Sequence, residues 1–488
     1  MTPVTALWLT LALPLAGAAL IVLLDRYPNP REAVSLVTAG LLFGLVVRLW
    51  FAARAGEWPA LVLVETLPGL PLALAVEPLG LLFALVASFL WIVTSLYSIG
   101  YMRDNRERNQ TRFYVCFAVA LASTMGVALS ANMFTLFVCY EVLTLSTYPL
   151  VAHSGTAEAR RAGRLYLGLL IGTSIGLQLL AIVWTWMLAG TLDFRVGGVL
   201  AGVASPFLTG ILLVLYIFGI GKAALMPLHR WLPAAMVAPV PVSALLHAVA
   251  VVKAGVFTVL KVLVYIFGLD LLGQIVSGNW LLYVAGASII MASVIALRSD
   301  NLKRRLAYST VSQLSYVIMA AAILAPLSVA GAALHIAAHA FGKITLFFAA
   351  GSIYIATHKT EVSQLDGIGR RMPWTMGAFA VGSLSMIGLP PAAGFVSKWY
   401  IVLGALQAGR PFAVAVIVLS TLLNAAYFLP IIYRAFFRAP NKPSHGKHGE
   451  APLPIVAALT ISASLTVLLF LFPGPALELA HQFAGANG

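Results

Sequence analysis

The stretch VPVSALLHAVAVVKAGVFTVLKVLVYIF, residues 240–267, is almost entirely apolar, and its only charged side chains are Lys253 and Lys261. A helix needs about 20 apolar residues to cross the hydrocarbon core of a bilayer. The stretch is long enough, and Lys253 lies at its centre, from which a lysine cannot bring its amine to water at either surface. The segment therefore predicts a membrane-spanning helix that carries a charge in its middle.

The whole chain has the composition of a membrane protein. Of its 488 residues, 61% are hydrophobic and 9% are charged, which excludes an ordinary soluble enzyme. We predict an all-α membrane protein with about fourteen transmembrane helices. The first apolar run lacks a basic segment and a small-residue cleavage site, so we interpret it as a span and not as a removed signal. The expected spans are 4–24, 32–53, 77–100, 112–130, 132–152, 163–187, 206–236, 240–267, 278–297, 303–324, 327–357, 373–408, 411–433 and 451–473.

The basic residues alternate between the two sides of this predicted topology. Of 30 Lys and Arg residues, 21 lie in odd-numbered connections and four, Arg48, Arg54, Arg195 and Arg410, lie in even-numbered ones. The positive-inside rule places the basic connections in the cytoplasm. We therefore expect a multi-pass protein of a bacterial-type inner (plasma) membrane with both termini outside the cytoplasm. The net charge of +14 sets this orientation, and no nucleic-acid partner is expected.

Two expected spans are unusually long and contain helix breakers. Residues 206–236 include Gly219, Gly221 and Pro227, and residues 373–408 include Gly388, Pro390, Pro391 and Gly394. Irregular backbone within a membrane is tolerated where it is buried in protein or lines a cavity. Two interrupted helices at corresponding positions indicate structural repeats. We expect a three-helix segment (1–101), two inverted five-helix repeats (112–267 and 278–437) with discontinuous helices 7 and 12, and a final helix (451–473).

Five lysines and one glutamate lie inside long apolar runs, where a membrane protein is expected to carry no charge. A charge at the bilayer centre costs about 2.5–3.5 kcal/mol on insertion scales, so these side chains must face a hydrated or paired interior. A buried row of such residues is typical of an ion or proton path. The six residues are Glu141, Lys222, Lys253, Lys261, Lys343 and Lys398.

Glu141 is the only acid deep inside an expected span, and Lys222 directly follows the breaker sequence of residues 218–221. A carboxylate and an ammonium group about 6 Å apart attract each other by roughly 3 kcal/mol at an effective dielectric constant near 20. Moving Glu141 away would favour release of the proton from a desolvated lysine. The alternative is that Glu141 is a protonated carboxyl that hydrogen-bonds between helices.

His335, His339 and Lys343 recur every four residues and share one helix face. A pair of histidines at this spacing is compatible with zinc, but a lysine on the same stripe repels a cation and no third ligand is evident. We therefore predict a proton relay and no metal or cofactor site. Lys261 lies two turns beyond Lys253 on one face and either snorkels to water or joins the row, so replacing it should be milder than replacing Lys253.

Several motifs resemble the antiporter-like subunits of respiratory complex I and of Mrp-type multisubunit cation/proton antiporters. They are Glu141 in its mid-span setting, Gly221-Lys222 followed by residues 227–233, residues 238–247 with Lys253, residues 301–310, His335 to Lys343, and residues 388–391 through Lys398. The resemblance covers nearly the whole chain, and the length is most like that of the Mrp D subunit.

The resemblance implies a hydrated axis in the membrane plane, along which protons move. Glu141 and Lys222 would act as an ion pair. Lys253 would connect this pair to the rest of the row, and Lys398 would be the terminal proton site. His247, His335, His339 and Lys343 complete the expected row, with Lys261 and His229 as secondary candidates.

Three kinds of assembly fit this row. The first is a cation/proton antiporter of the Mrp type, with Na⁺ or K⁺ left open as the exchanged ion. The second is a proton-pumping subunit of complex I or of a membrane-bound hydrogenase, whose redox centres would lie on partner subunits. The third is the membrane subunit of an inorganic-carbon uptake system. Each implies other membrane subunits as partners and a lipid bilayer around the complex.

Overall fold

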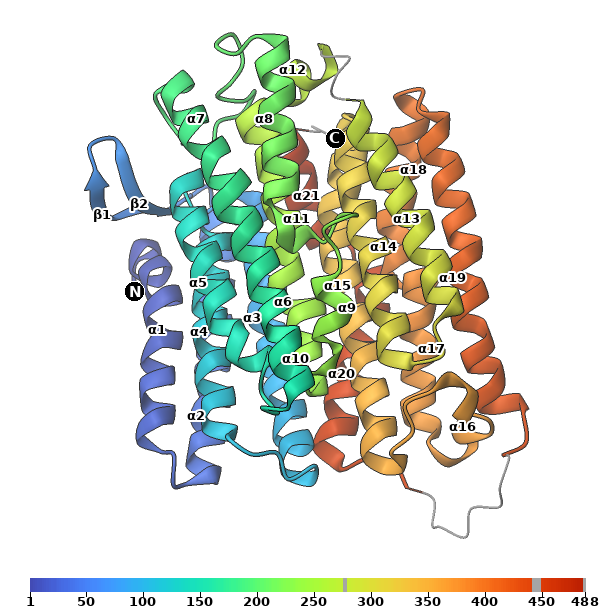
Figure 1. Ribbon diagram of the computed structural model, residues 1–488. Coiled ribbons are helices and arrows are strands. Elements are labelled where there is room, and N and C mark those ends of the chain that lie inside the picture. The colour runs from blue at the N-terminus through green and yellow to red at the C-terminus, as the bar shows by residue number, and fades with distance from the viewer. Residues whose placement is uncertain (275–278, 441–448, 486–488) are drawn as a thin grey trace.

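The computed structural model describes residues 1–274, 279–440 and 449–485. It is a bundle of long helices that run side by side between two ends (Figure 1). Within the described residues, eleven helices are long and apolar enough to cross a membrane. The prediction of an all-α membrane protein is confirmed, whereas the count of fourteen spans stays a prediction.

The helices begin and end close to the expected boundaries. In the first half they are α1 (Pro3–Leu23), α2 (Pro28–Arg54), α3 (Pro78–Asp104), α4 (Gln110–Ala128), α5 (Met133–Val151), α6 (Ala157–Thr173), α7 (Leu179–Ala189), α8 (Pro206–Gly219), α9 (Trp231–Ala234), α10 (Val240–Ala244), α11 (Val251–Lys261) and α12 (Leu269–Gln274). In the second half they are α13 (Trp280–Arg298), α14 (Leu302–Ala322), α15 (Pro326–Thr357), α16 (Ile368–Arg371), α17 (Pro373–Ile387), α18 (Ala393–Gln407), α19 (Pro411–Phe437), α20 (Leu453–Leu471) and α21 (Gly474–Ala484). Residue 278 of an expected span, and Lys442 and Lys447 of an expected basic connection, lie outside the described residues.

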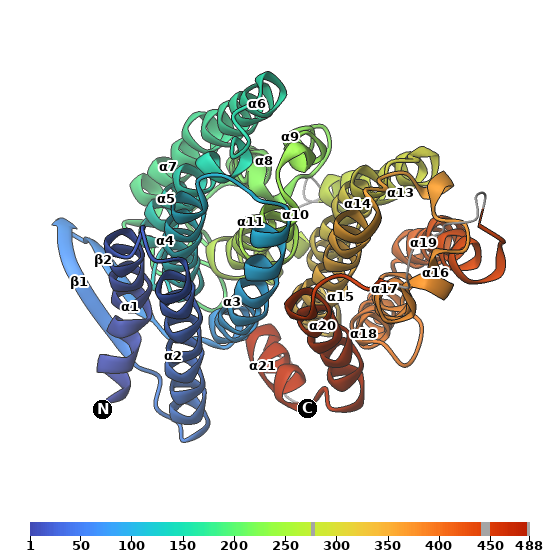
Figure 2. The same ribbon diagram turned by 90° about the horizontal axis from the view of Figure 1, so that it is seen from below.

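Two spans form the centre of the bundle. The apolar core windows of Val240–Phe267 and of α15 are completely buried. Helix α15 packs against α14, α17, α18 and α20, and Figure 2 shows it enclosed between these helices. Because helices that are apolar on all sides are normally buried, their sequences favour this position. The same two spans carry Lys253, Lys261 and the His335–Lys343 stripe, so these side chains face protein and not lipid.

Both expected interruptions are present, but they differ in form. Helix α17 ends where Gly388 adopts a left-handed φ of +91°, and α18 resumes at Ala393 after two prolines. Helix α8 ends at Gly219, a 3₁₀ turn follows at Gly221–Ala223, and only the four-residue α9 follows the break. Pro227 and Pro233 both lack the N–H that a continuous helix needs. The expectation of two similar broken spans is therefore met fully only in the second half.

The central stretch is less regular than its sequence suggests. Within Val240–Phe267, π-helical turns occupy Leu245–Val249 and Val262–Phe267, and they leave α11 as a separate 11-residue helix. Neither turn contains Gly or Pro, so local sequence gives no signal for it. Such turns are frequent at functional sites, and these two flank the helix that carries Lys253 and Lys261.

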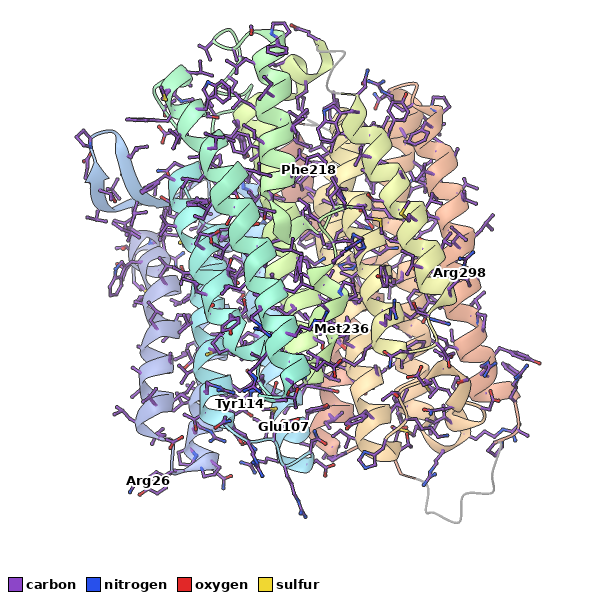
Figure 3. The ribbon with its side chains drawn as sticks, viewed as in Figure 1. Arg26, Glu107, Tyr114, Phe218, Met236 and Arg298 are labelled. Atoms are coloured by element: carbon purple, nitrogen blue, oxygen red, sulfur yellow. The ribbon has the colours of Figure 1, made fainter. Side chains whose placement is uncertain are left out.

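Two further elements were not expected. Strands β1 (Ala60–Leu67) and β2 (Leu70–Ala75) form an antiparallel hairpin between α2 and α3, and α21 packs on α3 and α15 after the last expected span. In Figure 1 the hairpin and α12 lie toward the upper end and α16 toward the lower one. Arg26 and Glu107 also lie at the lower end (Figure 3). Three connections of the expected basic side, those that contain Arg26, Glu107 and α16, thus lie at one end, which we call the basic end.

Gly255 provides a test of the packing at the first break. A Cβ at this position would overlap the Lys222 carbonyl and the Ala223 amide. We expect Gly255→Ala to lower the free energy of unfolding by about 1–3 kcal/mol because overpacking forces the backbone apart. Thermal unfolding of the purified complex measures the effect.

Gly168→Ala is the matched control, since a Cβ on this exposed residue of α6 meets nothing within 4 Å. It should be neutral or stabilise by up to about 1 kcal/mol. Equal melting temperatures for the two variants would contradict the packing described here.

Candidate functional site

Lys222 is held between the first break and helix α5. Its side chain is fully buried, and Nζ donates to the Tyr140 carbonyl at 2.8 Å and to Thr144 Oγ1 at 2.6 Å. The amine also lies 3.0 Å from the centroid of the Tyr140 ring, a cation–π position. The broken backbone allows this contact, because the 3₁₀ turn at Gly221–Ala223 brings the chain against α5.

Glu141 lies beside these contacts but does not form a direct salt bridge with Lys222. Although Glu141 and Lys222 are both among the described residues, their charged atoms do not come within 4.0 Å of each other, and neither Glu141 carboxylate oxygen has a hydrogen-bond partner. The Tyr140 carbonyl and Thr144 accept from two of the three donors of the Lys222 ammonium instead. A buried carboxylate without partners is costly, so Glu141 requires water, a proton or a movement of Lys222. The expected working pair stays a prediction.

Lys253 contacts a histidine directly. Its Nζ lies 2.5 Å from His339 Nδ1, and the contact joins α11 to α15. Both side chains are buried. Two cationic groups cannot share such a contact, so one of the two must be neutral while the other donates the proton. The contact is a hydrogen bond between two nitrogens that can each carry a proton.

His247 lies near this pair without a fixed partner. It is fully buried, its ring packs 4.8 Å from that of Phe347, and neither ring nitrogen has a hydrogen-bond partner among the described residues. Nε2 of His339 is also unpartnered within the described chain. Buried polar atoms of this kind are normally satisfied by ordered water.

His335 and Lys343 share a helix stripe but belong to different hydrogen-bond chains. His335 binds Ser397 Oγ at 2.9 Å and Gln313 Oε1 at 3.0 Å, and Gln313 donates to the Met386 carbonyl at 3.4 Å. We call this connection the histidine branch.

Lys343 points toward α14 instead. Its Nζ donates to Ser309 Oγ at 2.9 Å, and the same oxygen is hydrogen-bonded to the Tyr427 hydroxyl at 3.1 Å. Tyr427 also donates to Asn424 Oδ1, and Asn424 Nδ2 donates to the Met386 carbonyl at 3.2 Å. We call this connection the tyrosine branch.

Both branches meet at the end of α17, where Lys398 is bound. Its Nζ donates to the carbonyls of Met386 and Ile387 at 2.9 and 3.0 Å and lies 4.7 Å from the Tyr316 ring centroid. The last carbonyls of a helix have no partner within it and form its negative end. The break at Gly388 thus supplies two acceptors to a buried lysine, and Met386 is their meeting point.

Lys261 does not snorkel to water. Its side chain is 1% exposed and forms an ion pair of 2.6 Å with Glu77, which precedes α3. This overturns the snorkelling alternative, and Glu77 was not identified from the sequence because it borders a span and gives no local signal of its partner.

His229 lies apart from the row, 6.0 Å in ring centroid distance from Tyr308. Its Nδ1 has no partner among the described residues.

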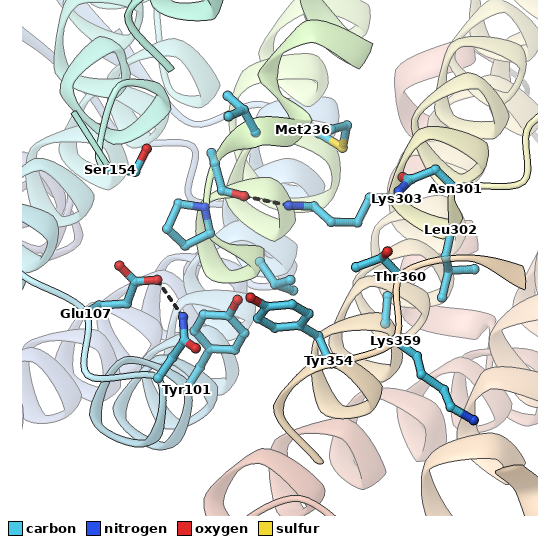
Figure 4. A pocket seen from close by; sticks show the side chains of 16 residues that line it. Tyr101, Glu107, Ser154, Met236, Asn301, Leu302, Lys303, Tyr354, Lys359 and Thr360 are labelled. Carbon is cyan, nitrogen blue, oxygen red and sulfur yellow. Dashed lines mark hydrogen bonds between the residues drawn. The ribbon is translucent and has the colours of Figure 1, made fainter. Parts of the chain in front are cut away.

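A pocket of about 290 Å³ opens near the basic end (Figure 4). Lys303 crosses it and donates to the Ala238 carbonyl at 2.6 Å, and Tyr101 and Tyr354 line its wall. At its rim, burial and the nearby Arg371 charge lower the pKa of Lys359. The wall includes Val240, the first residue of α10, so the helical turns that lead to His247 start at this pocket.

Comparison with known proteins identifies relatives over most of the chain. The family model described as NADH:quinone oxidoreductase/Mrp antiporter, TM, matches residues 130–424. NADH-quinone oxidoreductase subunit N of Desulforudis audaxviator is 37% identical over 388 residues, which are 78% of this chain and 75% of that protein. Hydrogenase-4 component B of Escherichia coli is 30% identical over 443 residues, which cover 84% of this chain and 65% of the relative. The D subunit of the Na(+)/H(+) antiporter of Alkalihalophilus pseudofirmus is 27% identical over 421 residues, which cover 85% and 83%.

Solved structures share the fold. A chain of the Mrp complex from Dietzia sp. superimposes with a TM-score of 0.88 at 22% identity and covers 99% of this chain and 97% of its own length. A chain of an archaeal membrane-bound sulfane sulfur reductase gives a TM-score of 0.86 at 24% identity, with 98% and 97% covered. The extent of the family match, together with the first relative, shows that this chain belongs to the NADH:quinone oxidoreductase/Mrp antiporter membrane family.

Proposed function

We propose that this chain is the proton-translocating subunit of a multisubunit monovalent cation/proton antiporter, similar to the Mrp D subunit. Protons would move along Glu141, Lys222, Lys253, His247, His335, His339, Lys343 and Lys398. The observation that carries this proposal is the set of fully enclosed amines whose partners are an imidazole, hydroxyls and carbonyls, together with the half-buried Glu141.

The chemistry of these partners favours proton movement over static pairing. Hydroxyl and neutral imidazole groups both donate and accept hydrogen bonds, so Ser309, Tyr427 and the histidines can pass a proton onward with water between them. Carbonyls only accept, so Met386 and Ile387 position Lys398 and do not conduct. A signal that changes the Glu141–Lys222 separation would shift the charge on Lys222 and then on Lys253.

A D subunit of a cation/proton antiporter among the relatives favours the antiporter assembly. The D subunit of the Na(+)/H(+) antiporter corresponds to this chain over 83% of its own length, whereas hydrogenase-4 component B extends well beyond the matched part. In the antiporter assembly the chain would sit with other membrane subunits in a bacterial plasma membrane, with both termini outside the cytoplasm.

A redox-driven proton pump is the second candidate. It is favoured by the 37% identity to NADH-quinone oxidoreductase subunit N. In such an assembly the same row would move protons, and other subunits would carry the electron-transfer centres.

Adding cations distinguishes the antiporter from the redox-driven pump. In inverted vesicles that contain the whole complex, respiration first generates a ΔpH. Na⁺ or K⁺ added afterwards should collapse this ΔpH if the complex is an antiporter. A complex that responds to neither ion but acidifies the vesicle lumen when given an electron donor and acceptor would be a redox-driven pump.

Lys222→Ala should abolish transport while the complex stays assembled. Removal of an essential proton carrier is expected to cost about 10²-fold or more in rate. Proton flux in inverted vesicles and co-purification of the partner subunits measure transport and assembly. Arg298→Ala, at an exposed position at the end of α13, is the control and should transport normally. Normal flux in Lys222→Ala would refute the proposed row.

Tyr427→Phe tests the tyrosine branch. It removes the hydroxyl that joins Ser309 to Asn424 and keeps the ring. The hydroxyl takes part in two hydrogen bonds worth about 1 kcal/mol each, so its loss predicts a decrease of about 30-fold in proton flux. Tyr433→Phe, an exposed position on the same helix, should have no effect, and a similar flux in both variants would mean that Lys343 does not act through this branch.

A further inference from the structure

The Lys261–Glu77 ion pair lies away from the row and at the end of the bundle opposite the basic end. Lys261 Nζ is 2.6 Å from Glu77 Oε1, and the two side chains are 1% and 16% exposed. The segments around the pair come from three connections on that side. Glu77 follows the hairpin, Ser130 lies between α4 and α5, and Phe194 lies between α7 and α8.

These segments shield the amine but leave the carboxylate a route to water. Lys261 Nζ lies 3.4 Å from the Ser130 carbonyl, 3.7 Å from the Phe194 ring centroid and 5.3 Å from the Tyr265 ring centroid. The charged residues on the Phe194 loop, Asp193 and Arg195, are themselves 4.0 Å apart and largely exposed. Of the two side chains in the pair, Glu77 is the one that is partly exposed to solvent.

An apolar plug separates this pair from the row. Lys253, Phe257 and Lys261 recur every four residues on α11, so Phe257 lies between the two lysines along about 12 Å of helix. Phe257 is fully buried, packs 5.2 Å from the Phe83 ring and lies 5.7 Å from Lys261 Nζ. Hydrophobic constrictions of this kind gate ion movement by excluding water.

The helix that carries these three residues is bounded by irregular backbone on both sides. The π-helical turns Leu245–Val249 and Val262–Phe267 flank α11. Because π turns interrupt the regular hydrogen-bond register, irregular backbone separates α11 from the helical turns on either side. A rotation of α11 would displace Phe257 from Phe83.

We propose that Glu77 and Lys261 form a proton-exchange site that faces the side opposite the basic end, and that the Phe83–Phe257 contact is its gate toward the row. The site rests on the proposed proton-translocating function. When the pair exchanges, one proton passes from the Lys261 ammonium to the Glu77 carboxylate, which leaves an amine and a carboxylic acid. The acid releases this proton to water, and the amine is recharged from Lys253 through water that enters when the gate opens.

A passive leak assay tests the gate and the site together. Phe257→Ala should raise the rate of ΔpH decay in vesicles of the whole complex about tenfold, because water can then connect Lys253 with Lys261. Adding Glu77→Gln to this variant should return the decay to within about twofold of the parent rate, because glutamine cannot carry the proton. Glu77→Asp, which keeps the carboxyl group, should preserve the leak.

The controls separate this site from a purely structural ion pair. Phe113→Ala removes an equally buried ring near the basic end and should not leak. If Glu77→Gln prevents assembly, Glu77→Gln/Lys261→Gln, which removes both charges together, takes its place. A leak that persists in either neutral variant, or no leak in Phe257→Ala, would overturn the site. Because the leak is measured without an exchanged cation, it is independent of whether Lys222→Ala abolishes coupled transport.

Discussion

The fold depends on the burial of amines inside an apolar bundle without enough carboxylates to pair them. Each uncompensated charge would cost several kcal/mol in the membrane, so every lysine of the row needs other acceptors. Lys222 and Lys398 obtain theirs from main-chain carbonyls, and Lys398 in particular uses the end of a broken helix. The second helix break therefore supplies acceptors to Lys398, and the first brings Lys222 against the acceptors on α5.

The same constraint explains how the polar groups are arranged around α15. This helix is enclosed by helices from both halves of the chain, so the side chains on its opposite faces meet different partners. His339 reaches Lys253 on α11, His335 reaches Gln313 and Ser397, and Lys343 reaches Ser309. A single helix thus connects the first half of the chain to the break in the second half. Its position at the centre of the bundle keeps this connection away from lipid.

The sequence predicted features that depend on neighbouring residues, such as helix breaks. It did not predict side-chain partners that come from distant parts of the chain. Gly388 with Pro390 and Pro391 predicted a break correctly, because these residues cannot continue a helix. The shared stripe of His335, His339 and Lys343 suggested one relay, but in the structure each of the three residues has different hydrogen-bond partners. Glu77 and Asn424 were not predicted as site residues, because neither an acid at a span boundary nor a single asparagine belongs to a sequence pattern that indicates a function.

The sequence by itself determined the membrane class, the approximate spans, the breaks and the ionisable residues that must be shielded, because hydrophobic length and the lack of an N–H in proline act locally. Tertiary structure alone decided which way each side chain turns and what it binds. Helix periodicity fixes which residues share a face, but neither the rotation of that helix nor the neighbour it meets. For that reason the sequence allowed Lys261 to extend to water. In the structure α11 packs against α3, and Lys261 forms an ion pair with Glu77 instead.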